Sequence, residues 1–479
     1  MKVAVEGCCH GQLDAIYSHI QRLESQKKYK VDLLLICGDF QATRDNHDLQ
    51  TMAVPQKYKH MGDFHKYYTG QATAPILTVV IGGNHEASNH LWELYHGGWL
   101  APNIYFLGHA GCVQVNGVRV AGASGIFKQH DYHRGHFERQ PYNNSTMRSI
   151  YHIREYNVRR LSLLSSPDVF LSHDWPCGIE QHGDLNDLLR RKPFFRDDIM
   201  SNKLGSPPLM VLLRNLQPTW WFAAHLHTRF EARVRHDPPL ETTTTLSPSS
   251  PSSGPPPRAG NPDEITIDDN EEEDVEGLVE DSGFDAPSGG STIPRVAASI
   301  APPPPQNPDE ITLDDEIEMV EPPLPPPPPP RETTFLALDK CLPRRQFLEV
   351  VDIPTPTQEQ EGGSGGERQR DAVVLSYDPE WLAITRAFQP YLSLQSQQAT
   401  YPNPDDARAA VSREWDWVHA HVPPKLNLGG GNDNGGDRWC VDACQRFARG
   451  PPAGNGNSAA ALAQTEAFAA LLEMENVVR

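Results

Sequence analysis

The stretch KVAVEGCCHGQ at residues 2–12 joins a short aliphatic run to a cysteine–cysteine–histidine block. Val3 and Val5 are typical of a buried β-strand, and Cys8 and His10 follow directly where that strand ends. A thiol and an imidazole are both ligands for divalent transition metals. The stretch therefore predicts a buried strand with metal-binding side chains after its carboxyl end.

Strand-like and helix-like segments alternate along the first 235 residues. Further buried strands are expected at residues 31–36 and 76–81, and an amphipathic helix at residues 13–23 lies between the first two strands. This alternation predicts an α/β core with helices on its faces. More strands are expected at residues 113–115, 118–121, 169–171 and 220–223, and a single helix at residues 147–164.

Residues 236–332 differ in composition from both flanking regions. The stretch 237–330 holds 21 Asp and Glu residues against Arg258 and Arg295, which accounts for −19 of the net charge of −20. So few apolar side chains cannot offset the entropy cost of folding, and we predict a disordered acidic and Pro-rich insertion. The remaining residues are close to neutral, so the total charge does not exclude an RNA partner.

The insertion contains one motif twice, NPDEITIDD at residues 261–269 and NPDEITLDD at residues 307–315. One interpretation is a docking segment that adds a strand to the edge of a partner's sheet. The other is a duplication without function.

Period-two alternation resumes at Thr333. We expect the strands at residues 229–234 and 333–338 to be sheet neighbours separated by the insertion, because a long surface loop costs little closure entropy. The predicted organisation is a catalytic domain (1–235), the insertion (236–332), a strand with a smaller C-terminal region (333–425), and a Gly- and Asn-rich linker with a terminal helix (426–479). Within these parts, helices are expected at residues 379–388, 412–419 and 459–478, and the linker at residues 428–437.

The eight cysteines show no paired framework, the N-terminus has no apolar leader, and no 18 apolar residues run together. These features are typical of a soluble intracellular protein with free thiols and no membrane partner.

Four further polar blocks each follow a predicted strand, at residues 38–39, 83–86, 172–174 and 224–227. In α/β sheets, loops at the carboxyl ends of strands converge on functional sites. A single histidine or cysteine there is more often structural, and Cys9 and Cys37 are interpreted as core residues. Five blocks in series instead predict a centre for divalent metals with seven ligands, namely Cys8, His10, Asp39, Asn84, His173, His225 and His227.

The order of the blocks resembles the calcineurin-like metallophosphoesterase family, with its D-x-H, G-D, G-N-H-[DE], histidine and G-H-x-H motifs. Cys8 stands where that family has aspartate, and Ala224 stands where it has glycine. The cysteine is characteristic of the lariat debranching enzymes. Longer matches to that subfamily are SGIFKQHDYHRGHFE at residues 124–138, FLSHDWP at residues 170–176 and FLALDKCLPRR at residues 335–345.

The resemblance implies a metallophosphoesterase β-sandwich flanked by helices, with one or two divalent ions per chain. One ion would use Cys8, His10, Asp39 and His227, and the other Asp39, Asn84, His173 and His225. Fe²⁺, Zn²⁺ and Mn²⁺ are the expected ions, and a soft thiolate at Cys8 favours Zn²⁺ or Fe²⁺ over Mg²⁺.

The resemblance also implies hydrolysis of the 2′–5′ phosphodiester bond at the branch point of excised intron lariats. We predict attack by a metal-bound hydroxide and protonation of the leaving 2′-oxygen by His85, which adjoins Asn84 but is assigned to no metal. The alternative role for His85 is to orient the neighbouring ligands.

Residues 128–160 interleave basic and aromatic side chains, which suits phosphates and unpaired bases. The resemblance identifies this stretch as a lariat-recognition insertion. The expected RNA contacts are Lys128, Tyr132, Arg148, His152 and Arg154. A solvated charged helix face is the alternative, and it explains Arg159 and Arg160 equally well.

Two other functions stay open at this point: a generic metallophosphoesterase, and a non-enzymatic scaffold that docks partners through its acidic repeats. The expected partners are branched intron RNA and, through residues 261–269 and 307–315, splicing or RNA-turnover proteins. The resemblance implies a nuclear location.

Overall fold

The computed structural model describes residues 1–236, 331–356, 373–427, 439–450 and 459–478. These residues all belong to one of the two units into which the chain divides. The predicted acidic insertion with its two repeats, and the linker predicted at residues 428–437, lie outside the described residues.

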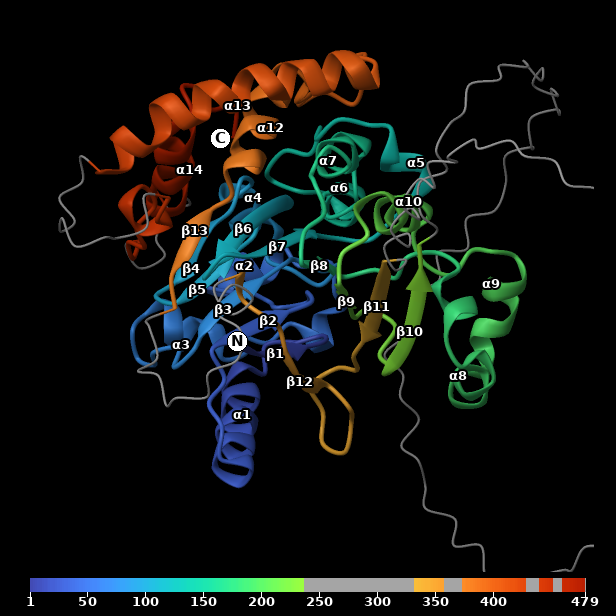
Figure 1. The fold of residues 1–479 in the computed structure, drawn as a ribbon. Coiled ribbons are helices and arrows are strands. Elements are labelled where there is room, and N and C mark those ends of the chain that lie inside the picture. Colours follow the sequence, from blue (N-terminus) through green and yellow to red (C-terminus); the bar gives the residue numbers. More distant parts are fainter. Residues whose placement is uncertain (237–330, 357–372, 428–438, 451–458, 479) are drawn as a thin grey trace, which may run out of the picture. The chain divides into compact units, whose positions relative to one another are not determined.

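Two β-sheets form the centre of the described unit (Figure 1). The first has the order β12-β1-β2-β3-β5-β4, and its strands are β1 (Lys2–Glu6), β2 (Leu33–Ile36), β3 (Leu77–Val80), β4 (Gly98–Ala101), β5 (Ile104–Phe106) and β12 (Leu348–Asp352). The second has the order β10-β11-β9-β8-β7-β6-β13, with strands β6 (Ala110–Val115), β7 (Val118–Ala123), β8 (Val169–Ser172), β9 (Trp220–Ala223), β10 (Phe230–Arg235), β11 (Glu332–Ala337) and β13 (Leu375–Tyr377).

Successive side chains along the strands alternate between an inner and an outer apolar core. Val3 and Val5 of β1 share the inner core with Val120 and Leu171 of the second sheet. Ala4 points the other way, into the core that includes residues of α1 (Leu13–Lys27). The two sheets therefore form the predicted β-sandwich.

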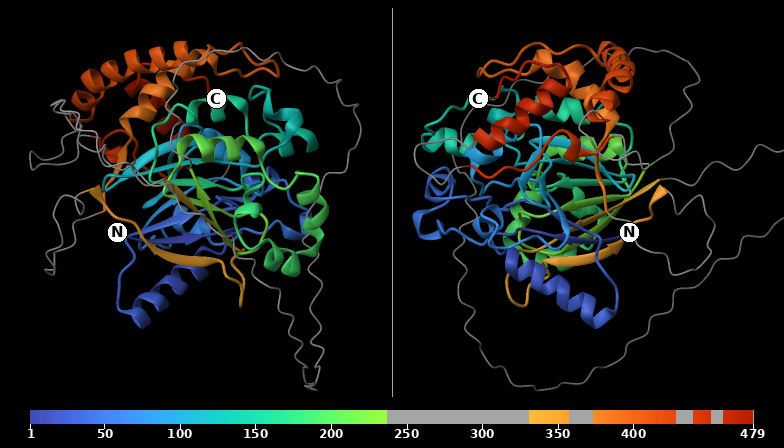
Figure 2. Two further views of the ribbon diagram at one scale, coloured as in Figure 1. Left: turned by 45° about the vertical axis from the view of Figure 1, so that its right-hand side comes forward. Right: turned by 90° about the vertical axis from the view of Figure 1, so that its left-hand side faces the viewer.

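Helices cover both outer faces of the sandwich. Figure 1 and the left view of Figure 2 show α1 on one side of the stacked sheets, with α7 (Glu155–Leu161) and α10 (Pro207–Leu216) on the other. Phe170 and Trp221 of the second sheet pack in the same core as α10. The other α-helices among the described residues are α2 (Asn46–Gln50), α3 (Phe64–Tyr68), α4 (Ser88–Glu93), α5 (Gln129–Tyr132), α6 (Asn144–Ser149), α8 (Leu185–Arg191), α9 (Arg196–Met200), α12 (Pro379–Phe388), α13 (Pro404–Asn427) and α14 (Ala459–Leu471).

The strands on either side of the acidic insertion are direct neighbours, as predicted. β10 pairs antiparallel with β11, with Phe230 opposite Ala337 and Arg235 opposite Glu332. β11 also pairs parallel with β9, so it lies between two strands from the first half of the chain. The residues after the insertion are therefore required to complete the second sheet.

The prediction of one helix at residues 147–164 is wrong. The chain forms α6 and α7, separated by residues 150–154. Two backbone hydrogen bonds join this interval to Ile126. Ile126 donates its N–H to Tyr151 O at 3.3 Å, and Ile153 donates its N–H to Ile126 O at 2.9 Å. This pairing with a distant segment replaces the helical hydrogen bonds, so tertiary contacts override the local helical pattern.

The C-terminal region extends the same core. α12 has the predicted bounds, the helix predicted at residues 412–419 is part of the longer α13, and α14 ends before the predicted residue 478. Val418 of α13 and Phe468 of α14 lie in the inner core with Tyr377 of β13. Among the described residues, no helix is both long and apolar enough to cross a membrane.

Candidate metal centre

The predicted ligands all lie in loops that follow strands of the two sheets. β1, β2 and β3 run parallel in the first sheet, and β8 and β9 run parallel in the second. Parallel strands bring their carboxyl ends to the same edge of a sheet, and the loops there meet. The ligands follow these strands in order: Cys8 and His10 after β1, Asp39 after β2, Asn84 after β3, His173 after β8, and His225 and His227 after β9.

Cys8, His10, Asp39 and His227 form one group, in which the ligand atoms all lie within 4.8 Å of one another. His10 Nε2 is 3.3 Å from His227 Nε2 and 3.7 Å from Asp39 Oδ2. The backbone N–H of His225 donates to Cys8 Sγ at 3.2 Å, which ties the first block to the last. This is the set that the resemblance assigned to one ion.

His173 lies at the centre of the second predicted group. Its Nε2 is 3.4 Å from Asp39 Oδ1 and 3.1 Å from Asn84 Oδ1, and its ring centroid is 5.0 Å from that of His225. Nδ1 of His173 bonds to Cys37 O at 2.8 Å, so Nε2 is the nitrogen that faces the centre. The second group is therefore also assembled.

Asp39 lies between the two groups. Its Oδ1 faces His173, whereas its Oδ2 faces His10 and lies 3.6 Å from His85 Nδ1. A carboxylate with one oxygen toward each group can bridge two cations. Four residues of the centre have left-handed backbones, a conformation that is uncommon for residues other than glycine. They are His10, Asp39, His225 and His227, with φ values of 44°, 47°, 62° and 45°.

The charge states of these groups suit cation binding. Burial opposes ionisation of Asp39, but His173 and His85 outweigh it and hold the pKa of that carboxyl well below its usual value. Burial is the main cause that lowers the pKa of His225 to about 3 and that of His227 to about 2, so both rings are neutral. Anionic carboxylates and neutral imidazoles are the forms that ligate metals. The residues therefore fit a divalent transition metal.

Cys8 differs because its thiol must lose a proton before it can bind a metal. Burial and the nearby carboxyls of Asp39 and Glu6 raise its pKa well above the usual value. Metal binding at this group is therefore coupled to proton release.

His85 lies beside both groups. Its backbone N–H donates to Asp39 Oδ1 at 2.9 Å, and its ring centroid is 5.6 Å from that of His10. The side chain is 20 % exposed, so it faces both the centre and solvent. This position suits proton transfer to a substrate that enters from solvent.

Glu86 was not among the predicted site residues, although it ends the GNHE block. Its carboxylate accepts hydrogen bonds from the backbone N–H groups of Phe40 at 2.8 Å, Gln41 at 2.9 Å and Gly83 at 3.0 Å. It therefore clamps the loop of Asp39 to the loop of Asn84. A Cβ on Gly83 would lie 2.1 Å from Asp39 Oδ1, which explains glycine at this position.

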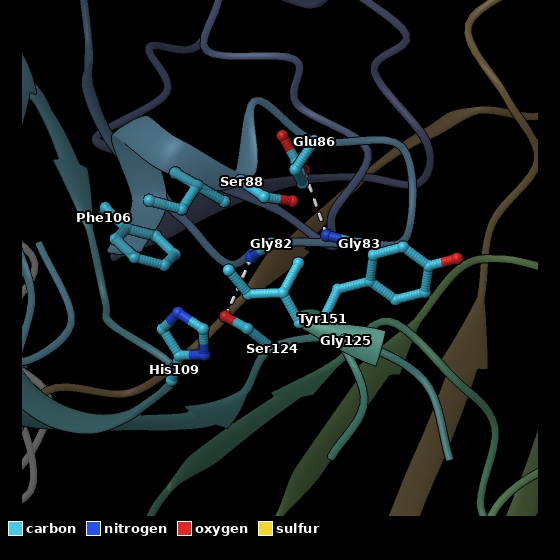
Figure 3. Close-up of a pocket in the computed structure, with 11 residues that line it drawn as sticks. Gly82, Gly83, Glu86, Ser88, Phe106, His109, Ser124, Gly125 and Tyr151 are labelled. Atoms are coloured by element: carbon cyan, nitrogen blue, oxygen red, sulfur yellow. Dashed lines mark hydrogen bonds between the residues drawn. The ribbon is translucent and has the colours of Figure 1, made fainter. Parts of the chain in front are cut away.

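Figure 3 shows a small cavity beside Glu86 and Gly83, with Tyr151 of the recognition insertion on one side. Ser124, just before this insertion, accepts the N–H of Gly82 at 2.9 Å. Phe127 donates its N–H to Asp174 Oδ2 at 3.1 Å, next to the ligand His173. The segment that leads into the insertion is thus anchored on two of the ligand loops.

The predicted RNA-contacting residues separate into two sets. Lys128 and Tyr132 are partly exposed and Arg148 is exposed. Arg154 has no exposed surface, and its guanidinium donates to Asp131 O at 2.8 Å and to Glu138 Oε1 at 2.5 Å. His152 is also buried, with Nδ1 2.7 Å from Asp131 Oδ2. Arg154 and His152 are therefore corrected to residues that hold the insertion together, because neither presents its charge to solvent.

Family models match two parts of the chain. Residues 1–229 match the calcineurin-like phosphoesterase family, and residues 330–477 match the C-terminal domain of lariat debranching enzyme. The second match begins at the end of the acidic insertion and includes β11, α12, α13 and most of the C-terminal region.

Relatives named lariat debranching enzyme match most of the chain. The Schizosaccharomyces pombe enzyme is 42 % identical over 90 % of this chain and 88 % of its own length. The Drosophila melanogaster enzyme is 48 % identical over 84 % of this chain and 64 % of its own length, and the Danio rerio enzyme is 41 % identical over 87 % of this chain and 56 % of its own length. This chain thus spans little more than half the length of some of these relatives. The extent and level of identity show that the chain belongs to the lariat debranching enzyme family.

Proposed function

We propose that this protein is a metal-dependent phosphodiesterase that hydrolyses the 2′–5′ bond at the branch point of intron lariat RNA. The observation that carries the proposal is the pair of ligand groups that share Asp39, with His85 beside them and in neither group. The names of the relatives supply the substrate class.

Cys8, His10, Asp39 and His227 would hold one ion, and Asp39, Asn84, His173 and His225 the other. The sulfur ligand favours Fe²⁺ or Zn²⁺ in the first group, and Mn²⁺ also accepts this mixture of nitrogen and oxygen ligands. When bound, such ions lower the pKa of water and neutralise charge on a phosphate.

His85 would protonate the 2′-oxygen as it leaves. Its Nδ1 lies 3.6 Å from Asp39 Oδ2, and the side chain is partly open to solvent, from which a substrate would enter. The backbone N–H bond to Asp39 Oδ1 positions the residue without occupying its ring nitrogens.

Lys128 and Tyr132 would contact the RNA near the centre, with Arg148 on the exposed surface of the insertion. Lys128 follows Phe127, whose backbone N–H donates to Asp174 Oδ2 next to the ligand His173. A cation there suits the phosphates that flank the branch point.

The test is cleavage of a synthetic RNA with one 2′–5′ branch, compared with a linear RNA of the same sequence, with Mn²⁺ or Fe²⁺ supplied. Release of the branch with an intact linear control is the expected result. Turnover of a simple phosphodiester without cleavage of the branch would instead identify a generic metallophosphoesterase.

We also propose a nuclear location, because intron lariats are products of splicing. We further propose that splicing or RNA-turnover proteins dock on residues 261–269 and 307–315. Imaging of the tagged chain tests the location. Unchanged co-purifying proteins after deletion of both repeats would contradict the docking role.

A further inference from the structure

A cleft that is lined by none of the metal ligands opens between α2 and the recognition insertion. It has a volume of about 360 Å³ and is lined by His47 and Gln50 of α2, the adjacent Thr51, and Gln140, Pro141, Tyr142 and Met147 of the insertion. This volume lies in the range of sites that bind small organic groups. The cleft is therefore large enough for a planar heterocycle.

The lining residues favour a neutral aromatic ligand. Pro141, Tyr142 and Met147 supply apolar surface, and the amides of Gln50 and Gln140 supply both donors and acceptors. No Lys, Arg, Asp or Glu is among these described lining residues, which argues against a phosphate or an amine inside the cleft.

Both walls of the cleft are held in place. Thr51 donates to Asn89 Oδ1 at 2.7 Å, which joins one wall to α4, the helix that follows the GNHE block. On the other wall, Tyr142 packs against the apolar cluster that includes Trp92 of α4 and Ile150. Asn143 caps α6 by accepting the backbone N–H groups of Ser145 and Thr146. A cleft with fixed walls costs its ligand little ordering of the protein.

The cleft is close to the metal centre along α6. Met147 lines the cleft, whereas Ile150 and Tyr151, just after the end of the same helix, line the cavity beside Gly83 (Figure 3). A helix of six residues spans only ~9 Å. A group in the cleft and a phosphate at the centre can therefore belong to neighbouring nucleotides.

We propose that this cleft receives an unpaired nucleobase of the RNA next to the branch point. The base stacks on Tyr142, and the amides of Gln50 and Gln140 meet its polar edge. Aromatic stacking with a few amide contacts is how proteins bind single-stranded bases. The inference rests on the proposed debranching function and adds a specificity site to it.

The test is the ratio of kcat/KM for branched RNA to kcat/KM for bis(4-nitrophenyl) phosphate, which is too small to reach both sites. Tyr142→Leu should lower this ratio roughly 5- to 100-fold, the range that one stacked base contributes. Gln50→Ala, at an exposed residue where misfolding is not a concern, should lower it roughly threefold or more. Tyr29→Leu and Gln56→Ala, outside the cleft, are the matched controls and should keep the wild-type ratio.

A branched RNA with 4-thiouridine beside the branch point provides a second measurement. Irradiation should crosslink it to peptides that contain residues 47–51 or 140–147. Wild-type ratios in both cleft variants, with crosslinks only elsewhere, would overturn the cleft assignment while debranching stands. If the wild-type protein cleaves only the small ester, the proposed function itself fails.

Discussion

The metal centre and the recognition insertion are both rich in charged and polar side chains, but they use them differently. At the centre, polar atoms from five loops point toward one another around Asp39, and several backbones there are left-handed. In the insertion, the buried charges form closed pairs such as Arg154 with Glu138 and His152 with Asp131. Groups that neutralise one another are not available to a ligand, so function in the insertion belongs to its outer residues.

The largest effect that tests this difference is expected at His85. His85→Ala should lower kcat on branched RNA by ~10²–10⁴-fold, because the leaving oxygen loses its proton donor. Bound metal, measured by elemental analysis, should stay at the wild-type level. His60→Ala, at an exposed histidine outside both the metal centre and the insertion, is the control and should retain activity. Unchanged turnover of His85→Ala would remove the catalytic role.

Arg154→Leu should act on stability. It would leave the buried carboxylate of Glu138 without its cation, and breaking a buried pair typically costs about 3–5 kcal/mol in the free energy of unfolding. Denaturant titration measures this change. A variant of wild-type stability with much weaker RNA binding would contradict the correction and restore Arg154 as an RNA contact.

Asp131 should make the stability of the insertion depend on pH. Burial opposes ionisation of its carboxyl, but hydrogen bonds from His152 and Arg134 lower its pKa to about 2, below the usual 3.8. Because the folded pKa is below the unfolded one, the stabilisation is present above pH ~4 and is lost as the pH falls toward 2. The free energy of unfolding of Asp131→Asn should lie about 2 kcal/mol below that of the wild type at pH 6.

This difference between Asp131→Asn and the wild type should shrink between pH 4 and pH 2.5, as measured by urea titration at each pH. A constant difference over that interval would show that the charge of Asp131 does not contribute. Asp45→Asn at the N-cap of α2, outside the insertion, is a matched carboxyl control for the pH series.

The smallest effect is expected at Arg148, which represents the outer face of the insertion. Arg148→Ala should leave the free energy of unfolding within about 0.5 kcal/mol of the wild type, because the side chain is exposed. It should raise KM for branched RNA a few-fold. The slope of the logarithm of the binding constant against the logarithm of the salt concentration should become shallower by roughly one, the value for one lost phosphate contact. An unchanged salt dependence would place the RNA elsewhere.

The five polar blocks could be located from the sequence because each depends on a local rule. A short aliphatic run ends, and a metal-type side chain follows, as in Val3 to Cys8 and in Trp220 to His225. The strand pair across the acidic insertion was predictable for the same reason, since both strands alternate with a period of two. Glu86 was present in a recognised block, but its role as a clamp depends on backbone groups from two separate loops.

The pattern of residues thus specifies the sandwich strands and the candidate ligands. The alternation of apolar residues, the end of a strand and the chemistry of a ligand are all properties of neighbouring residues. Three features were decided only in the folded chain. They are the oxygen of Asp39 that faces each ligand group, the break between α6 and α7, and the burial of Arg154. Each depends on contacts between segments far apart in sequence, such as His173 with Cys37 or Ile126 with Tyr151. A charged side chain looks the same in the sequence whether its partner is solvent, RNA or a buried carboxylate, and only packing distinguishes these cases.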